Sequence, residues 1–358
     1  MKLLSRVRDA LRFAINQRRY DFKNSRQPEQ LSFAKLKHVV VSKMDGKLGD
    51  SQVMTPFFTE LRRAFPEVKI SVLCSQNVAP IYRDCLQLDG VYVVPKRPSA
   101  QALDAVCAQI EKVAPCDLLI TLEGYFRFQD FYLAHKLHPD FVAGIAAKVQ
   151  CININLEVRN REQHITAYFA DLLRLGGVKE PVISYNPLVS AASEAKAAQY
   201  CRKPQLAFAP WGASRHKHLS DEVVKALLKV MGDQSSANIA LLVPPEGNYL
   251  QELAKTVISS GRLIAIPAKM DCLELASIIN HSCALISVDT GNLHLACASQ
   301  IPLFAIYNGN NSGLNVRWAP LPGKQDVEIF SRAGKMIDEL TAADLTDGVA
   351  AFIEKYNL

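Results

Sequence analysis

Short apolar runs alternate with amphipathic segments along most of the chain. In the amino-terminal half, runs rich in β-branched and aliphatic residues predict strands at 38–42, 68–75, 90–95, 116–124 and 141–145. Between them, apolar residues recur at helical spacing, as in residues 50–65 and in the helix that Ser99 is expected to cap. This alternation predicts a parallel sheet with helices on both faces.

The alternation starts a second time after an interruption. A helix over 163–175 ends at two glycines, and a stretch containing Pro181 and Pro187 follows. Strands and helices then alternate again from 205–210 to 301–307. The pattern predicts an α/β protein with two Rossmann-like, doubly wound domains facing a central cleft, because ligands of such sheets bind at the carboxyl ends of the strands.

These patterns also set the expected domain bounds. We expect an N-terminal extension over 1–35, an N-terminal domain over 36–178, a linker over 179–200 and a C-terminal domain over 201–340. The last residues, 341–358, are expected to form a helix that packs back on the N-terminal domain.

The N-terminal extension reads as a basic amphipathic helix. Leu4, Val7, Leu11 and Ile15 follow helical spacing. The basic residues around them are Lys2, Arg6, Arg8, Arg12, Arg18 and Arg19. Two interpretations stay open: contact with an anionic membrane surface, or a helix docked on its own domain with a solvated basic face. No apolar run approaches the ~20 residues of a transmembrane segment, and charges interrupt any secretory signal.

Composition and charge narrow the class of protein only slightly. Apolar residues make up 49% of the chain, which indicates a folded protein, and the net charge of +6 suits an acidic small molecule, an anionic membrane or nucleic acid. Basic residues are not interleaved with aromatic ones, which argues against nucleic acid. The nine cysteines form no CxxC pair, so we expect reduced, mostly buried thiols in a cytosolic protein rather than zinc or disulfides.

The densest candidate chemistry lies where the strand at 283–288 gives way to a helix. Asp289, Thr290 and Gly291 stand at this junction, and His294 lies one turn into the helix. A helix N-terminus presents unpaired N–H groups and a positive dipole end, which stabilise an anion such as phosphate, and glycine lets a ligand approach the backbone. A purely structural interpretation stays open, in which Asp289 and Thr290 cap the helix and His294 is buried.

Three stretches together resemble glycosyltransferase family 9, the ADP-heptose:lipopolysaccharide heptosyltransferases. They are "SKMDGKLGDSQVMTPFFTELRRAFP" (42–66), "FAPWGASRHKHLSDE" (208–222) and "VDTGNLHLACASQIPLFAIYNGNNS" (288–312). The resemblance covers about residues 36–335. It implies the GT-B fold, with an acceptor domain followed by a nucleotide-sugar donor domain, and an inverting glycosyltransferase that requires no metal or other cofactor. The chain contains no Asp-x-Asp metal motif.

The resemblance also assigns roles to residues. Asp50 would be the general base, with Asp45 as a rival and an N-cap as the alternative for Asp50. Donor diphosphate contacts are expected from Lys217, Ser214, Thr290, Gly291 and His294. Donor sugar or nucleoside contacts are expected from Asp289, Glu246 and Asn308, the last in a turn with Gly309 and Asn311. On the acceptor side we expect basic groups near the cleft, namely Arg127, Arg62, Arg63 and Arg97, with Lys96 beside them. His216 and His218 resemble a metal pair only superficially.

The implied reaction transfers heptose from ADP-L-glycero-β-D-manno-heptose to the Kdo-lipid A inner core in lipopolysaccharide biosynthesis. The partners would be the nucleotide sugar and an anionic lipid acceptor, and the enzyme would be cytoplasmic or peripheral on the cytoplasmic face of the inner membrane. A relative using another nucleotide sugar, and a non-catalytic nucleotide-sugar-binding core-assembly protein, remain alternatives. A dinucleotide-dependent oxidoreductase is disfavoured because neither domain opens with Gly-x-Gly-x-x-Gly.

Overall fold

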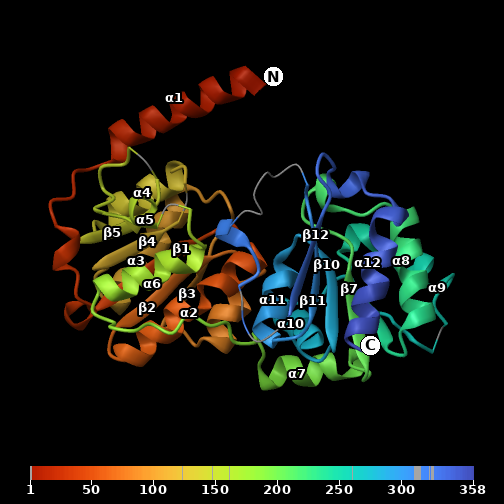
Figure 1. Cartoon of the computed structure of the whole chain (residues 1–358). Helices are drawn as coiled ribbons and strands as arrows, with labels where there is room; N and C mark the ends of the chain where they lie inside the picture. The colour runs from red at the N-terminus through yellow and green to blue at the C-terminus, as the bar shows by residue number, and fades with distance from the viewer. Residues whose placement is uncertain are drawn as a thin grey trace. The chain divides into compact units, whose positions relative to one another are not determined.

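The computed structural model describes residues 2–122, 124–146, 148–160, 162–259, 261–309, 316–321, 323 and 326–358. The chain forms two compact units, each built on one sheet (Figure 1). Unit 1 comprises Met1–Lys47 and Met54–Ile183, and unit 2 comprises Leu48–Val53 and Ser184–Leu358. The boundary after Ile183 falls inside the segment expected as a linker.

Unit 1 carries a six-stranded parallel sheet with the order β3-β2-β1-β4-β5-β6. Its strands are β1 (His38–Lys43), β2 (Lys69–Cys74), β3 (Gly90–Val93), β4 (Leu118–Thr121), β5 (Phe141–Gly144) and β6 (Ile154–Asn155). Its α-helices are α1 (Lys2–Tyr20), α2 (Leu48–Ala64, whose first turn groups with unit 2), α3 (Ala100–Val113), α4 (Phe128–Leu137), α5 (Leu156–Asn160) and α6 (Ile165–Leu175). Short helical turns are η1 (Pro28–Gln30), η2 (Phe33–Lys35) and η3 (Ile81–Cys85).

The core of unit 1 lies on both faces of this sheet. All six residues of β1 are buried, as expected for a central strand with helices on each side. On one face, Val40 and Leu119 pack with Phe131 of α4 and Leu103 of α3. The predicted cap of α3 is confirmed, because Ser99 Oγ accepts a hydrogen bond from the Ala102 N–H at 3.2 Å.

Unit 2 carries a second six-stranded parallel sheet with the order β12-β11-β10-β7-β8-β9. Its strands are β7 (Gln205–Ala209), β8 (Asn238–Leu241), β9 (Leu263–Ile264), β10 (Ala284–Val288), β11 (Leu303–Tyr307) and β12 (Val327–Ser331). Its α-helices are α7 (Ala191–Ala197), α8 (Asp221–Gln234), α9 (Tyr249–Lys255), α10 (Cys272–Asn280), α11 (Gly291–Ser299) and α12 (Ala342–Lys355). Short helical turns are η4 (Ala198–Tyr200), η5 (Arg215–Lys217), η6 (Pro245–Gly247), η7 (Val316–Trp318) and η8 (Ile337–Glu339).

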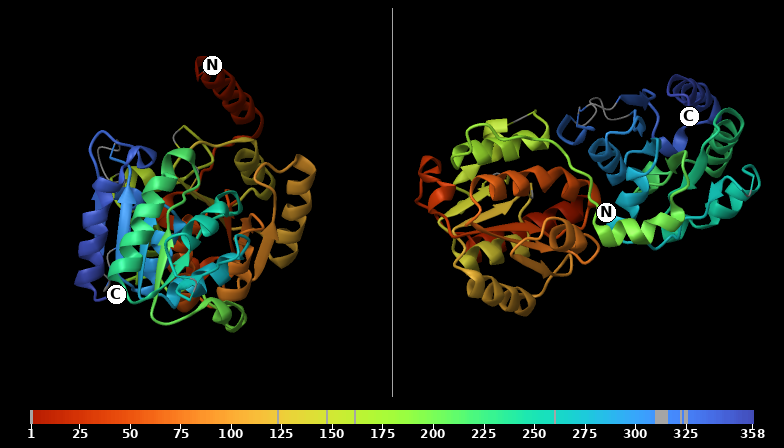
Figure 2. Two further views of the ribbon diagram at one scale, coloured as in Figure 1. Left: turned by 90° about the vertical axis from the view of Figure 1, so that its right-hand side faces the viewer. Right: turned by 90° about the horizontal axis from the view of Figure 1, so that it is seen from below.

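The two sheets share one topology. In each sheet, the first three strands follow one another from the centre toward one edge. The fourth strand pairs with the other side of the first, and the fifth and sixth continue toward the opposite edge. Helices cover the strands in each unit (Figure 2). The prediction of two Rossmann-like, doubly wound domains is therefore confirmed. The chain reverses its direction of growth between β1 and β4 in unit 1 and between β7 and β10 in unit 2, and ligands bind at such points.

The C-terminal helix α12 belongs to unit 2. It packs against α8, and Leu345, Val349 and Phe352 are fully buried in the core of that unit. The Phe352 ring meets Phe304 of β11 edge-on, with the ring centroids 5.6 Å apart. The expectation that residues 341–358 pack back on the N-terminal domain is therefore wrong, because the apolar face of this helix is already used within unit 2.

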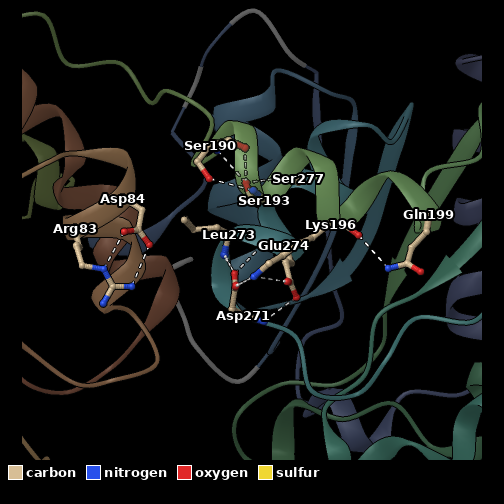
Figure 3. A network of polar contacts seen from close by, with 10 residues as sticks. All are labelled: Arg83, Asp84, Ser190, Ser193, Lys196, Gln199, Asp271, Leu273, Glu274 and Ser277. Carbon is tan, nitrogen blue, oxygen red and sulfur yellow. Dashed lines mark hydrogen bonds and ion pairs between the residues drawn. The ribbon is translucent and has the colours of Figure 1, made fainter.

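Helix α7 lies inside the segment 179–200 that was expected as a linker, yet it is fastened to unit 2. Ser193 Oγ lies 3.0 Å from Ser277 Oγ of α10, and Lys196 Nζ lies 3.3 Å from Glu274 Oε1 of the same helix (Figure 3). Within the expected linker, residues 179–190 form neither helix nor strand, whereas α7 and η4 occupy the remainder.

Helix α1 lies against α4 of unit 1 (Figure 1). The Phe13 ring meets Phe131 with the centroids 5.4 Å apart, and the Tyr20 ring meets Tyr132 at 5.3 Å. Within the described residues, no helix, α1 included, combines the length and the apolar content needed to cross a bilayer.

Candidate functional site

The junction between β10 and α11 has the form that the sequence predicts. β10 ends at Val288, and α11 begins at Gly291. Thr290 is the N-cap of this helix, and its Oγ1 accepts a hydrogen bond from the Asn292 N–H at 3.2 Å. The capping interpretation of Thr290 is therefore correct. Thr290 Oγ1 also lies 3.3 Å from Ser287 Oγ, whose hydroxyl donates to the Val288 carbonyl, so the Thr290 hydroxyl can donate either to Ser287 or to a ligand.

Lys217 and Asp289 form an ion pair, with Lys217 Nζ 2.5 Å from Asp289 Oδ2. The side chains remain 35% and 26% exposed. Asp289 follows β10 and Lys217 follows β7, so the pair bridges the loops at the point where the sheet of unit 2 reverses its growth. A carboxylate such as that of Asp289 would by itself repel a phosphate. Here it holds the Lys217 ammonium group beside the start of α11, which explains its presence at a predicted phosphate site.

The loop after β7 fixes the position of Lys217. The Gly212 N–H donates to the Lys217 carbonyl at 2.8 Å, and the Lys217 N–H donates to the Ser214 carbonyl at 2.8 Å. A Cβ atom on Gly212 would lie 2.5 Å from Lys217 Cβ, so only glycine fits there. Ser214 itself is exposed directly before η5.

The two histidines of this loop point to different partners. His218 stacks on Trp211 with the ring centroids 4.0 Å apart, and its Nε2 lies 2.7 Å from the Gly212 carbonyl. His216 Nδ1 lies 3.0 Å from Asp338 Oδ2. The contacts of both histidines therefore hold the loop after β7 in place. Across the residues that the structure describes, no group of three or more His, Cys, Asp and Glu side chains is placed to hold a metal ion, and all nine cysteines are free thiols.

The segment Leu48–Val53, which groups with unit 2, meets the start of α11 backbone to backbone. A Cβ atom on Gly291 would lie 2.7 Å from the Gly49 backbone nitrogen, and one on Gly49 would lie 2.9 Å from the Gly291 Cα. Asp50 follows Gly49 in the first turn of α2 and is half-buried. α2 begins at Leu48 with Lys47 as its N-cap, so Asp50 is not the cap.

His294 lies one turn into α11 and is buried, with 6% of its surface exposed. Its ring faces Gly49 and meets the Tyr185 ring edge-on, with the centroids 6.2 Å apart. Of the residues expected around the diphosphate it is therefore the least accessible, and its clearest contacts are with Gly49 and Tyr185.

The residues expected at the donor sugar or nucleoside lie on neighbouring loops of the same sheet edge. Glu246 is exposed in η6, after β8, and the adjoining Gly247 backs onto the Trp211 ring, which a Cβ atom would approach to 3.0 Å. Asn308 follows β11, and its Oδ1 is buried without a hydrogen-bond partner within the described structure. Asn311 lies outside the described residues.

Unit 1 has a hollow of its own at the carboxyl ends of its strands. It is lined by Ser42 of β1 and by residues that follow β1, β3 and β4, namely Met44, Asp45, Lys96, Arg127, Gln129 and Asp130. Arg127 is the N-cap of α4, where its N–H donates to Asp130 Oδ2 at 2.8 Å. Arg127 and Lys96 give the hollow two positive groups at the point between β1 and β4 where ligands of this topology bind.

Asp45 also lines the hollow, but its carboxylate forms ion pairs with two lysines. Lys43 Nζ lies 2.8 Å from Asp45 Oδ1, and Lys47 Nζ lies 3.4 Å from Oδ2. Burial works to raise the pKa of the Asp45 carboxyl, but the charge and hydrogen bond of Lys43 and the charge of Lys47 outweigh it and hold the pKa below its usual value. A carboxylate held ionised in this way is a weak proton acceptor, which leaves Asp50 as the better candidate base.

Arg62 and Arg63 do not reach this hollow. Arg62 Nη2 lies 2.8 Å from Asp89 Oδ2, and Asp89 accepts the Ile70 N–H at the amino-terminal end of β2. Arg63 forms two hydrogen bonds with Glu60, at 3.0 and 2.8 Å. The expectation that these arginines lie near the cleft side is therefore wrong, because α2 carries them to the opposite edge of the sheet. Arg97 is exposed after β3, next to Lys96.

Trp211 is the residue of this region that sequence reasoning missed. It lies two residues after the end of β7, stacks on His218 and meets Tyr249 edge-on with the centroids 6.2 Å apart. A half-buried tryptophan just beyond a central strand was the available signal, since the carboxyl ends of parallel strands form the ligand-binding edge.

Comparison with known proteins assigns the chain to a family. Residues 129–338 match the family model of glycosyltransferase family 9 (heptosyltransferase). No curated protein matches the chain in sequence.

Among solved structures, a glycosyltransferase family 9 protein from Veillonella parvula has a TM-score of 0.76 and 16% identity, covering 91% of this chain and 98% of its own. ADP-heptose lipopolysaccharide heptosyltransferase II of Escherichia coli has a TM-score of 0.67 and 12% identity, over 90% of this chain and 100% of its own. The E. coli heptosyltransferase WaaC with ADP has a TM-score of 0.64 and 19% identity, over 89% of this chain and 98% of its own. The two parallel sheets thus have the GT-B fold of these structures, and the chain belongs to glycosyltransferase family 9 (heptosyltransferase).

Proposed function

We propose that this protein transfers heptose from ADP-L-glycero-β-D-manno-heptose to the Kdo-lipid A inner core, with inversion and without a metal ion. The observation that carries the proposal is the Lys217–Asp289 pair beside the start of α11. It places an ammonium group beside the positive N-terminal end of α11 at one point of the sheet edge, as a sugar diphosphate requires. Adenosine as the nucleoside is supported by the related WaaC structure, which contains ADP.

On the donor side, the diphosphate oxygens would accept hydrogen bonds from the Gly291 N–H at the start of α11 and from the Thr290 hydroxyl. Lys217 would turn from Asp289 to the diphosphate, and Ser214 would add a hydroxyl donor. As the bond between the anomeric carbon and the phosphate oxygen breaks, negative charge grows on the diphosphate, and these groups stabilise it more than they stabilise the bound substrate. His294 is buried against Gly49, so its main role would be to keep Gly49 and Gly291 close together.

Asp289 would then be released to accept hydroxyl hydrogens of the donor sugar. Glu246 would accept from the ribose hydroxyls, and Asn308, whose Oδ1 is buried without a partner within the described structure, from the sugar. A carboxylate and an amide oxygen are the acceptors that hydroxyl groups need when water is excluded.

Asp50 would serve as the general base. The acceptor hydroxyl gives its proton to the Asp50 carboxylate while its oxygen forms a bond to the anomeric carbon, and ADP leaves from the opposite face with the electrons of the broken bond. The configuration at that carbon inverts in this single displacement.

The acceptor would enter at the hollow of unit 1. Arg127 and Lys96, with Arg97 beside them, would bind the carboxylate and phosphate groups of an anionic glycolipid. The enzyme would work in the cytoplasm, peripheral to the cytoplasmic face of the inner membrane.

The proposal is tested by transfer assays with ADP-heptose, UDP-sugars and GDP-sugars on a heptose-deficient lipid acceptor, together with calorimetric titration of ADP. We expect transfer from ADP-heptose alone, loss of at least about a hundredfold in turnover for Asp50→Asn, and unchanged ADP binding by that variant. Transfer from another nucleotide sugar would overturn the donor assignment. Full activity of Asp50→Asn would overturn the role of Asp50, and no transfer with any donor would favour a non-catalytic binding protein.

A further inference from the structure

Helix α1 exposes a stripe of large apolar side chains. Val7, Leu11 and Ile15 are 61%, 59% and 55% exposed, although an amphipathic helix normally buries such residues. They succeed one another at intervals of four residues, so they lie on one face of the helix. We call these three residues the α1 stripe.

The α1 stripe is not the face by which the helix docks. Phe13 packs on Tyr125 and Phe131, with centroids 5.3 and 5.4 Å apart, and Tyr20 packs on Tyr132 at 5.3 Å. Phe13 and Tyr20 are seven residues apart, about two turns, and at 100° per residue they point away from Leu11 and Ile15. The Tyr125 hydroxyl also donates to the Asp9 carbonyl. Docking is therefore complete on one side of α1 while the other side stays open to solvent.

Arginines border the open side. Arg8, Arg12 and Arg19 are exposed, and helical spacing places them along one flank of the α1 stripe. Over its whole length α1 has six basic residues and one acidic residue, Asp9. The helix thus combines a narrow apolar stripe with a dense positive border.

We propose that α1 binds the surface of an anionic lipid bilayer, lying in the plane of the membrane. The α1 stripe would enter the boundary between headgroups and acyl chains, and the bordering guanidinium groups would contact lipid phosphates. The choice of a bilayer rests on charge complementarity, because an anionic surface neutralises the whole row of arginines at once, without any requirement for a matching groove.

The docking partner of α1 connects this surface to the hollow of unit 1. Tyr125, which contacts Phe13, lies two residues before Arg127, and Arg127 lines that hollow. A membrane-bound α1 would therefore hold the hollow close to lipid headgroups. This last consequence rests on the proposed function, whereas the binding of α1 to lipid does not.

The test is cosedimentation of the full chain with vesicles of equimolar phosphatidylglycerol and phosphatidylcholine, and with vesicles of phosphatidylcholine alone. We expect binding to the anionic vesicles that weakens in high salt. Arg8→Gln, Arg12→Gln and Arg19→Gln together should weaken it on the order of a hundredfold, from about 1 kcal/mol, or fivefold, per basic residue. Val7→Ser, Leu11→Ser and Ile15→Ser together should weaken it at least about tenfold.

A matched control is Val158→Ser, which removes an 80% exposed valine from α5 and should leave vesicle binding unchanged. The unfolding temperature of each variant should equal that of the parent protein, because every substituted side chain is exposed. Equal binding to both vesicle types, or undiminished binding by the serine triple variant, would overturn the proposal. A concentration-dependent dimer that the serine variant abolishes would also overturn it, by assigning the α1 stripe to a second copy of the chain. Transfer to a delipidated, water-soluble acceptor should persist in all variants, so failure here is distinguishable from failure of the proposed reaction.

Discussion

Lys217 Nζ lies 2.5 Å from Asp289 Oδ2, which joins the loops after β7 and β10 across the centre of the second sheet. The pair is 35% and 26% exposed, so water screens it, and its contribution to stability is below about 1 kcal/mol. Folding alone therefore gives little reason to place a lysine and an aspartate together at a helix N-terminus. A ligand that carries both negative charge and hydroxyl groups gives one.

Lys217→Ala should reduce transfer by about 10² to 10³, because one positive group that stabilises the departing diphosphate is lost. The same variant should bind ADP more weakly, as measured by calorimetry. Lys217→Arg should restore only part of the activity, since guanidinium geometry differs from that of an ammonium group.

Lys229→Ala is the matched control, because Lys229 is exposed on α8 and should leave both quantities unchanged. If Lys217→Ala transferred heptose at the parent rate, the diphosphate site would have to lie elsewhere.

Sequence reasoning could name Lys217 and Asp289 but not their pairing. The residues are 72 positions apart, and they meet only because β7 and β10 are neighbours in the sheet. Strand order depends on how whole βα units pack, which no local pattern records. The start of α11 at Gly291, in contrast, was predictable, since a strand, a capping threonine and a helix follow one another locally.

Gly291→Ala should reduce transfer strongly and lower the free energy of unfolding by about 1–3 kcal/mol. The new methyl group would lie 2.7 Å from the Gly49 backbone nitrogen, and a backbone atom cannot rotate away as a side chain can. Urea denaturation gives the stability, and the transfer assay gives the activity.

The same substitution at Gly261 is the control, because no described atom lies within 4 Å of the Cβ position there. Unchanged stability and activity in Gly291→Ala would mean that the two backbones are not in contact in the working enzyme.

His38 should make the stability of the protein depend on pH near neutrality. Its Nδ1 lies 2.9 Å from the Ala114 carbonyl and its Nε2 lies 2.7 Å from Ser71 Oγ, so Nδ1 carries the hydrogen. Burial lowers the pKa of His38, and the Ala114 carbonyl together with the charges of Asp117 and Asp89 offsets this only in part.

The sign of the effect follows from that lowered pKa. The unfolded chain takes up a proton at about pH 6.5, whereas the folded protein keeps His38 neutral to lower pH. The stabilisation is complete above that pH and is lost as pH falls from 6.5 toward the folded pKa, by at most about 1.4 kcal/mol per pH unit. Urea titrations between about pH 8 and about pH 5 measure the free energy of unfolding across this range. For His38→Gln, that free energy should depend less steeply on pH than it does for the parent protein. Parallel curves for the two proteins would contradict this role of His38.

Helices α2 and α12 show which positions in the fold a local sequence pattern can and cannot predict. A helix that follows a parallel strand starts at the carboxyl edge of the sheet and returns to the amino edge, so the last turn of α2 had to place Arg62 and Arg63 far from the ligand edge. The position of these arginines therefore follows from the order of strand and helix along the chain. The packing of α12 on α8 was not predictable, because an amphipathic helix at either unit would have the same apolar spacing.

Arg127 and Arg63 offer a direct comparison of the two edges of the first sheet. Arg127→Ala should raise the KM for the lipid acceptor by about 10- to 100-fold, since each charge-assisted hydrogen bond to an anionic group contributes about 1.5–3 kcal/mol, and should leave the KM for the donor unchanged. Arg63→Ala should alter neither KM, because Arg63 pairs with Glu60 within α2, at the end of a helix of 17 residues that extends about 25 Å. Equal effects of both substitutions on the acceptor KM would indicate a general attraction of the basic protein for the lipid. An effect of Arg63→Ala alone would place the acceptor at the amino edge and remove the hollow of unit 1 from the reaction.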